Sequence, residues 1–160
     1  MNHECIKCEQ KTSQEKKGML TYPQPQVGNV TVYNVTYEKC SNCGKIFFPM
    51  ETFIALCHER QKILDSWIIS QPMNQFLSSR ETAIILNVTP QFLSKNKKIK
   101  QGLIFQAKKG KSTYYLKKSV EQYKKTGDGR FDLPKEELLL LQQEEKEEQK
   151  TKHGLDIVLD

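Results

Sequence analysis

The 160-residue chain has a formal net charge of +6 and a mean hydropathy of −0.65, values that suit a water-soluble protein with one medium or two small domains. No apolar run approaches the roughly 20 residues of a membrane-spanning helix, so we expect no membrane partner. Residues 76–130 carry thirteen Lys or Arg against three acids, whereas residues 131–160 have a net negative charge. This distribution predicts that the middle of the chain binds a polyanion.

The first chemical motif is a pair of Cys-x-x-Cys sequences, Cys5/Cys8 and Cys40/Cys43. Each pair presents two sulfurs from a tight turn, and two pairs supply the four tetrahedral ligands of a closed zinc site. Redox motifs, disulfides and an iron–sulfur site are the alternatives. Because four sulfurs leave no open position for water or substrate, we predict one structural Zn²⁺ held by Cys5, Cys8, Cys40 and Cys43.

The sequence begins Met1-Asn2-His3-Glu4, without the pattern of a signal peptide, so we expect a reducing cytoplasm. The fifth cysteine, Cys57, is then expected to be a small core residue on a helix. Its neighbour His58 does not complete a catalytic dyad, because adjacent helical residues point about 100° apart. We expect no enzyme, since no carboxylate pair, open metal site, phosphate loop or activated nucleophile is visible.

The segment between the cysteine pairs predicts a small sheet. Residues 10–18 are polar and read as a loop, residues 18–22 and 29–37 as strands, and the Pro-rich residues 23–28 as a turn. Helical periodicity over residues 50–70 predicts a helix with a core or dimer-packing face that includes Phe53. A domain this small buries little apolar surface, and a structural zinc, which supplies roughly 10–16 kcal/mol of apparent folding free energy, compensates.

The basic segment opens with two helix starts. Ser78-x-x-Glu81 is a capping box that predicts a helix over residues 80–86. Thr89-Pro90 starts a second helix, which we expect to run to about Gln101 and end at Gly102. The side chains expected in the core are Ala83, Ile84, Leu86, Phe92, Leu93 and Ile99. Helix, tight turn and cationic second helix form the helix-turn-helix pattern.

Two β-prone runs, residues 103–107 and 112–116, follow the second helix and are joined by a cationic tip, Lys108–Lys111. A helix from about Ser119 closes this segment, which therefore predicts a winged helix-turn-helix that binds DNA. Gln91, Ser94 and Lys95 are expected to reach base edges, and the later lysines to contact phosphates. The candidate DNA-binding residues are Ser79, Arg80, Gln91, Ser94, Lys95, Lys97, Lys98, Lys108, Lys109 and Lys111.

The acidic end begins with a helix-prone stretch at Leu133-Pro134-Lys135, continues as a charged segment of low complexity, and finishes in a short apolar run, Leu155–Leu159. Two interpretations remain open for it. The segment is either mostly disordered with one frayed helix, or it contacts a partner or braces a dimer.

Two stretches resemble known families. Residues 1–60 resemble the YgiT-type zinc finger of MqsA-like antitoxins in Cys5-x-x-Cys8, the Val/Tyr-rich strand Val30–Tyr37, and Cys40-x-x-Cys43-Gly44 followed by a helix. Residues 76–123 resemble the excisionase-type or MerR-like winged helix-turn-helix. The matching runs are Leu77–Ala83, Leu86-Asn87-Val88, Phe92–Lys95 and Tyr114–Tyr123. The resemblance implies that the N-terminal domain holds a cognate toxin, a ribonuclease, and that a homodimer binds a palindrome in its own promoter.

These observations predict an α+β protein with a zinc-pinned sheet domain and a helix over residues 1–72. A winged helix-turn-helix domain over residues 73–130 and an acidic, partly helical or disordered tail over residues 131–160 are expected to follow. The leading functional hypothesis is a type II antitoxin that neutralises its toxin and represses its own operon. The alternatives are a stand-alone or phage-derived transcription regulator and a zinc-stabilised protein-interaction adaptor.

Overall fold

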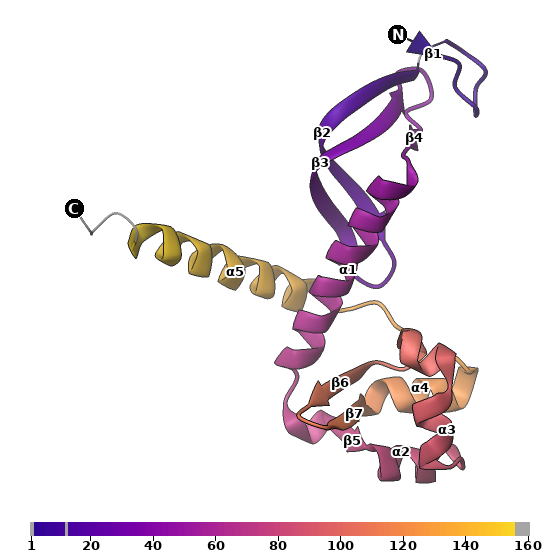
Figure 1. The fold of residues 1–160 in the computed structure, drawn as a ribbon, viewed down its shortest axis with the longest axis vertical. Helices are drawn as coiled ribbons and strands as arrows, with labels where there is room; N and C mark the ends of the chain where they lie inside the picture. The colour runs from indigo at the N-terminus through magenta and orange to yellow at the C-terminus, as the bar shows by residue number, and fades with distance from the viewer. Residues whose placement is uncertain (1, 12, 156–160) are drawn as a thin grey trace. The chain divides into compact units, whose positions relative to one another are not determined.

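The computed structural model describes residues 2–11 and 13–155, and it confirms the mixed α+β class. The chain divides into two compact units, Met1–Lys62 and Ile63–Asp160. Each unit has its own antiparallel sheet, in the order β1-β2-β3-β4 in the first and β5-β7-β6 in the second (Figure 1).

The first unit is built on one long hairpin of β2 (Ser13–Gln24) and β3 (Gly28–Cys40), with the short strands β1 (Asn2–His3) and β4 (Ile46–Phe47) at its edges. The expected loop over residues 10–18 is wrong from Ser13 onward, because these polar residues pair in register with the end of β3. The predicted turn at residues 23–28 shortens to residues 25–27 for the same reason, since pairing continues to Gln24↔Gly28.

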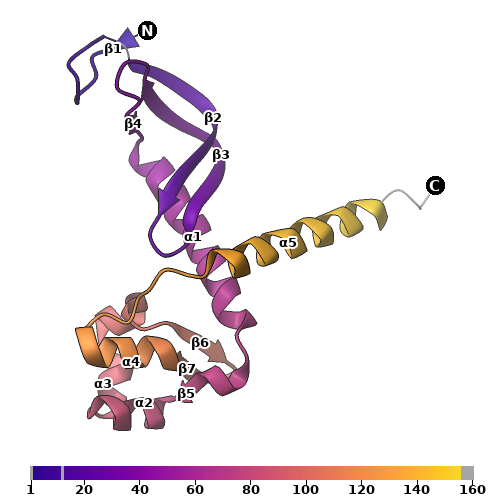
Figure 2. The same ribbon diagram turned by 180° about the vertical axis from the view of Figure 1, so that it is seen from behind.

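Helix α1 (Met50–Ser70) has the predicted bounds, and its first half lies along the hairpin (Figures 1 and 2). The Thr52 hydroxyl donates to the carbonyl oxygen of Thr36 at 2.7 Å, and Nε of Arg60 donates to that of Pro25 at 2.9 Å. Leu56, which lies between Thr52 and Arg60 in the sequence, is fully buried. Phe53 is 46% exposed and is not a core residue of this chain. The hairpin is therefore held by the helix along its length.

The second unit contains β5 (Phe76–Ser78), α2 (Ser79–Leu86), α3 (Pro90–Lys95), β6 (Gln106–Lys109), β7 (Ser112–Leu116), α4 (Lys117–Thr126) and α5 (Lys135–Leu155). Short helical turns at Met73–Gln75 and Ile99–Leu103 precede β5 and β6. Strand β5 was not predicted from the sequence, and it pairs with β7 to complete the sheet. The core of the helices and β7 consists of Ala83, Leu93, Ile99, Ile104, Tyr115 and Val120.

The predicted starts of α2 and α3 are confirmed atom by atom. The Ser78 hydroxyl accepts from the Glu81 amide at 3.2 Å, and the Glu81 carboxylate accepts from the Ser78 amide at 2.7 Å. The Thr89 hydroxyl likewise accepts from the Phe92 amide at 3.1 Å. Two of the expected core residues face solvent instead, since Ile84 is 73% and Phe92 42% exposed.

Helix α3 ends six residues earlier than predicted, at Lys95. The cause is Asn96, which has an extended ψ of 113° and whose side-chain oxygen accepts from the Ile99 amide at 3.2 Å. A side chain that caps the backbone in this way starts a new turn in place of the old helix. The helical backbone geometry of that turn breaks at Gly102, which has a φ of 100°, at the glycine where the sequence predicted the helix to end.

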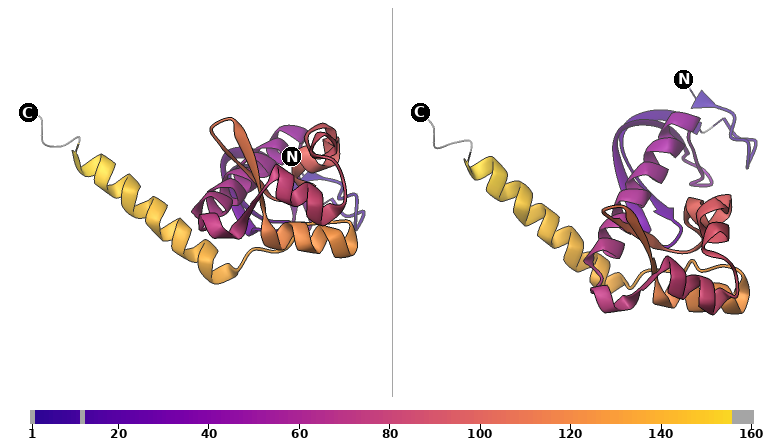
Figure 3. Two further views of the ribbon diagram at one scale, coloured as in Figure 1. Left: turned by 90° about the horizontal axis from the view of Figure 1, so that it is seen from below. Right: turned by 60° about the horizontal axis from the view of Figure 1, so that its bottom comes forward.

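The β6–β7 hairpin is tighter than predicted, because Lys108 and Lys109 belong to β6 and the turn consists of Gly110 and Lys111. Gly110 has a φ of 63°, the left-handed conformation that two-residue hairpin turns require. In the left view of Figure 3, the hairpin projects beyond α2, α3 and α4.

The acidic end forms helix α5, and the beginning of that helix is packed into the second unit. The indole N–H of Trp67 donates to the Glu137 carboxylate at 2.7 Å, and Leu138 is buried. Phe131, just before the helix, contacts the rings of Trp67 and Phe105 at centroid distances of 6.0 and 4.9 Å. The helix-prone stretch is thus helical over Lys135–Leu155, whereas most of the apolar run Leu155–Leu159 lies outside the described residues; contact with a partner stays a prediction.

Candidate metal centre

The four paired cysteines lie on two turns with the same backbone pattern. In the first turn, the Cys5 amide donates to the Gln10 carbonyl at 2.9 Å and the Glu9 amide donates to the Cys5 carbonyl at 2.8 Å. The second turn repeats this arrangement. The Cys40 amide donates to the Lys45 carbonyl, and the Gly44 amide donates to the Cys40 carbonyl, each at 3.0 Å. Glu9 and Gly44 occupy the same place in the two turns and both have positive φ values, 57° and 69°.

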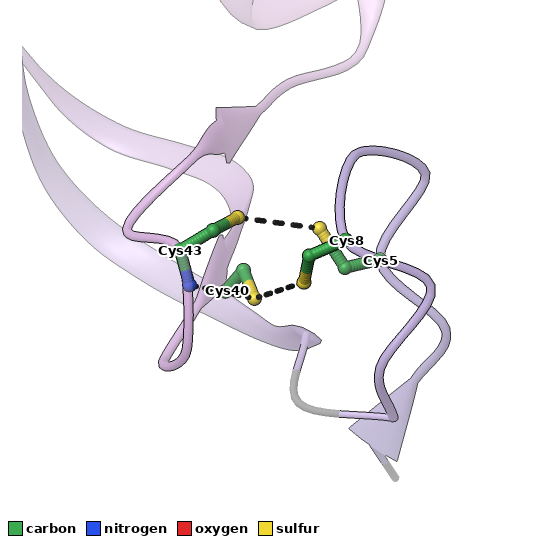
Figure 4. A group of neighbouring side chains, drawn as sticks. All are labelled: Cys5, Cys8, Cys40 and Cys43. Atoms are coloured by element: carbon green, nitrogen blue, oxygen red, sulfur yellow. Dashed lines mark hydrogen bonds between the residues drawn. The ribbon is translucent and has the colours of Figure 1, made fainter.

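The turns bring the four sulfurs together, as the sequence predicted (Figure 4). All four Sγ atoms lie within 4.8 Å of one another, and Cys5–Cys43 and Cys8–Cys40 are each 3.6 Å apart. A disulfide needs about 2.05 Å, so the cysteines are not bonded to one another. Four sulfurs at about 2.3 Å from a central ion form a tetrahedron with edges of about 3.8 Å. The spacing therefore fits a single tetrahedral metal ion.

The four cysteines differ in burial, and the pKa values of Cys8 and Cys43 are shifted in opposite directions. Cys5 and Cys40 are buried, whereas Cys8 and Cys43 are half-buried. The backbone N–H of Gln10 and the side chain of Asn42 hold the pKa of the Cys8 thiol below its ordinary value. The Lys45 backbone N–H lowers the pKa of Cys43, but burial and the neighbouring thiols outweigh it and raise that pKa to about 11. Thiols this close ionise together only when a cation balances their charge, which is what a bound metal supplies.

Among the described residues, this cluster is the only set of three or more His, Cys, Asp or Glu side chains placed to share one ion. Cys57 on α1 is half-buried, not the core residue that was predicted, and it is not part of the cluster. The exposed His58 is not part of it either.

The candidate DNA-binding residues all lie in the second unit. Nine of them are exposed: Arg80, Gln91, Ser94, Lys95, Lys97, Lys98, Lys108, Lys109 and Lys111. Ser79 is half-buried, and its hydroxyl donates to the Thr113 carbonyl at 3.3 Å. The Lys109 ammonium lies 3.1 Å from the sulfur of Met73 and 5.4 Å from the ring centroid of Phe76. Ser79 and Lys109 therefore have partners within the chain.

Helix α4 carries further lysines that are not among the candidate DNA-binding residues. Lys117, Lys118, Lys124 and Lys125 are all exposed on it, and Lys118 lies 4.5 Å from the ring centroid of Phe131. The charge count over residues 76–130 already contained them. No helix in the described part of the chain has the length and apolar character needed to cross a membrane.

The fold and the cysteine cluster define a mixed α+β protein with a four-sulfur site that can hold a metal ion. No family model, curated protein or solved structure matches the chain. The resemblances of residues 1–60 and 76–123 therefore stay predictions.

Proposed function

We propose that the protein is a zinc-stabilised, DNA-binding transcription regulator of the antitoxin kind that acts in the cytoplasm. The observation that carries the zinc assignment is the 3.6 Å separation of the sulfur pairs, which suits one small ion better than a multi-iron cluster. Zinc is the usual ion of closed four-cysteine sites and has no redox chemistry of its own. Its role is to hold the two turns of the first unit together.

For the second unit we propose a winged helix-turn-helix, with α2 and α3 as the helix pair and β6–β7 as the wing. Support comes from the two side-chain caps at the helix starts, the left-handed Asn87 between the helices, and the exposed lysines around them. In such a domain the start of the second helix enters the major groove. Gln91, Ser94 and Lys95 would then reach base edges, and they are all exposed on α3.

The proposed phosphate contacts take into account that one wing lysine is held by contacts within the unit. Lys109 is held against Met73 and Phe76, so Lys108 and Lys111 are the main wing contacts in this proposal. Lys97 and Lys98, which follow α3, contribute the others.

Salt dependence tests the wing. Replacing both Lys108 and Lys111 by Ala is expected to flatten the slope of log affinity against log salt by about 2, because each lost phosphate contact removes about 0.9. The matched control replaces Lys135 and Lys146 on α5, which removes the same charge from outside the proposed surface. Equal slopes for the two double variants would remove the wing from the interface.

The antitoxin part of the proposal is that the first unit neutralises a cognate toxin, a ribonuclease, while a homodimer represses the operon that encodes both. It is supported by the resemblance of the two segments to modules of antitoxins. Expressing the adjacent small reading frames, with and without this protein, tests it. Growth arrest that the protein relieves supports the antitoxin function, and no arrest from either neighbour favours a stand-alone regulator. Failure to discriminate operator from random duplex at moderate salt would favour the adaptor alternative.

A further inference from the structure

The first unit contains a cavity of about 390 Å³ beside the cysteine cluster, a volume within the range of ligand-binding pockets. Its lining comes from the first cysteine turn, from β2 and β3, and from the segment around β4. Acidic and aromatic side chains dominate it, and the residues used below are Glu4, Ser13, Glu15, Glu38, Phe47 and Phe48.

Strand register places two of the carboxylates against each other. Glu15 on β2 is directly opposite Glu38 on β3, and Glu38 is opposite Phe47 on β4. Directly opposed like charges destabilise a sheet, and a cation between them removes that cost. Lys16 and Lys39, the lysines that adjoin them in the strands, point to the other face of the sheet, because side chains alternate along a strand. Lys17, two residues after Glu15 and opposite Thr36, is on the same face as the carboxylates.

Among the residues that the structure describes, no ion pair involves Glu4, Glu15 or Glu38. The ion pairs Lys62–Glu59 and Arg130–Asp128 both lie away from the cavity lining. Glu38 does accept a hydrogen bond from the Ser13 hydroxyl at 3.1 Å, which fixes its position. The cavity is therefore acidic and in part already arranged for a cation.

The aromatic side is held in place as well. The Phe48 ring packs edge-on against Tyr22, with centroids 5.1 Å apart. A cation above an aromatic ring is attracted to its face, and a carboxylate alongside accepts its hydrogen bonds. Arginine suits this combination best, because its planar guanidinium stacks on a ring while its edge donates two parallel hydrogen bonds.

We propose that this cavity binds an arginine side chain presented by a basic protein partner. A metal ion fits less well, because Glu4, Glu15 and Glu38 are not among the groups of side chains close enough to share one ion. Nucleic acid is repelled by the same carboxylates. The inference goes beyond DNA binding, because it assigns a second recognition surface to the unit that carries the cysteine cluster.

The test uses the ¹⁵N-labelled full-length protein and N-acetyl-L-arginine amide as the probe, with N-acetyl-L-citrulline amide as its uncharged isostere. Nuclear magnetic resonance titration is expected to shift the amide signals of Glu15, Glu38 and Phe47 with the arginine probe. Citrulline is expected to bind at least roughly tenfold more weakly, because it lacks the charge that strengthens hydrogen bonds to a carboxylate. Equal binding of the two probes would overturn the proposal.

Variants locate the binding. Glu38→Gln keeps an oxygen that accepts from Ser13 but removes the charge, and it is expected to weaken arginine binding by roughly tenfold. Glu144→Gln on α5 makes the same charge change elsewhere and is expected to leave binding unchanged. If Glu38→Gln loses the dispersed spectrum of a folded protein, Glu15→Gln takes its place as the variant in which arginine binding is measured. Unchanged affinity in the folded variant, or the same shifts with Mg²⁺ alone, refutes an arginine site. DNA affinity of the same variant, measured separately, keeps this outcome distinct from the proposed function.

Discussion

Ser119 on α4 offers the sharpest test of how the second unit is held together. The side chain is fully buried, and its hydroxyl accepts from the Phe105 amide at 2.8 Å while donating to the Gly129 carbonyl at 2.7 Å. It therefore joins the chain before β6 to the chain after α4. Ser119→Ala leaves two buried backbone groups unpaired, and each costs about 1–3 kcal/mol. We expect a loss of about 2–6 kcal/mol in the free energy of unfolding.

Substitution of Gly129 tests the same contact from its other partner. A Cβ there would lie 2.6 Å from the Ser119 carbonyl oxygen, 2.7 Å from its Oγ and 2.8 Å from the Leu103 carbonyl oxygen. Two of these are backbone atoms, so the segment must move, and the 2.9 Å bond from the Gly129 amide to Leu103 is strained. Overpacking of this kind costs about 1–3 kcal/mol, which is the destabilisation expected for Gly129→Ala.

The assay is urea unfolding followed by tryptophan fluorescence. Trp67 is the sole tryptophan and is buried in the second unit, so its signal reports that unit. With a slope of about 1–3 kcal/mol/M, Ser119→Ala is expected to lower the urea midpoint by about 1 M or more. The control is Ser70→Ala, an exposed serine bonded to the Trp67 carbonyl, which is expected to change stability by less than about 0.5 kcal/mol. A midpoint shift for Ser119→Ala no larger than the control's refutes the reasoning.

Three further predictions follow from other contacts. Cys40→Ser is expected to lose one equivalent of metal and unfold the first unit, with the Trp67 transition unchanged; retained metal by elemental analysis would contradict this. The Ser78 amide lowers the pKa of Glu81, and the Arg130 side chain lowers that of Asp128 to about 2. A lowered pKa stabilises the folded state fully above the pKa of the unfolded chain, 4.5 for Glu81 and 3.8 for Asp128. The urea midpoint should therefore fall as the pH drops below these values, and it should fall less steeply in Glu81→Gln. Gly127→Ala, at a helix end with a φ of 77°, should cost about 1 kcal/mol in the same urea assay, and no loss would contradict the strain argument.

The features that the sequence revealed are those encoded within a few residues. Cys-x-x-Cys spacing, the Ser78–Glu81 capping box and Thr89-Pro90 each specify a local geometry, and the structure has all of them. The bounds of α1 also follow from local signals, namely its apolar periodicity and the Gln71-Pro72 sequence that ends it.

Features that depend on distant partners were missed. Residues 13–18 are polar and carry no strand signal, yet they are in β2 because β3 offers a complete edge to pair with. Strand β5 likewise exists only through its pairing with β7. The early end of α3 is a different case, because the asparagine that causes it was visible. Asn96 competes for the backbone as capping residues do, and a mid-helix asparagine was a signal to end the helix there.

The position of the cysteine cluster links the proposed metal to the proposed arginine site. Cys40 pairs in register with Ser13 at the open end of the β2–β3 hairpin, the end away from its closing turn. Ser13 and Glu38 line the cavity, and Glu4 and Cys5 reach it from the first cysteine turn. A metal ion that ties the two turns together therefore also fixes one wall of the cavity to the other. It follows that removing the metal should abolish arginine binding by the first unit, while the hydrogen bonds around Ser119 continue to hold the second unit and its lysines in place.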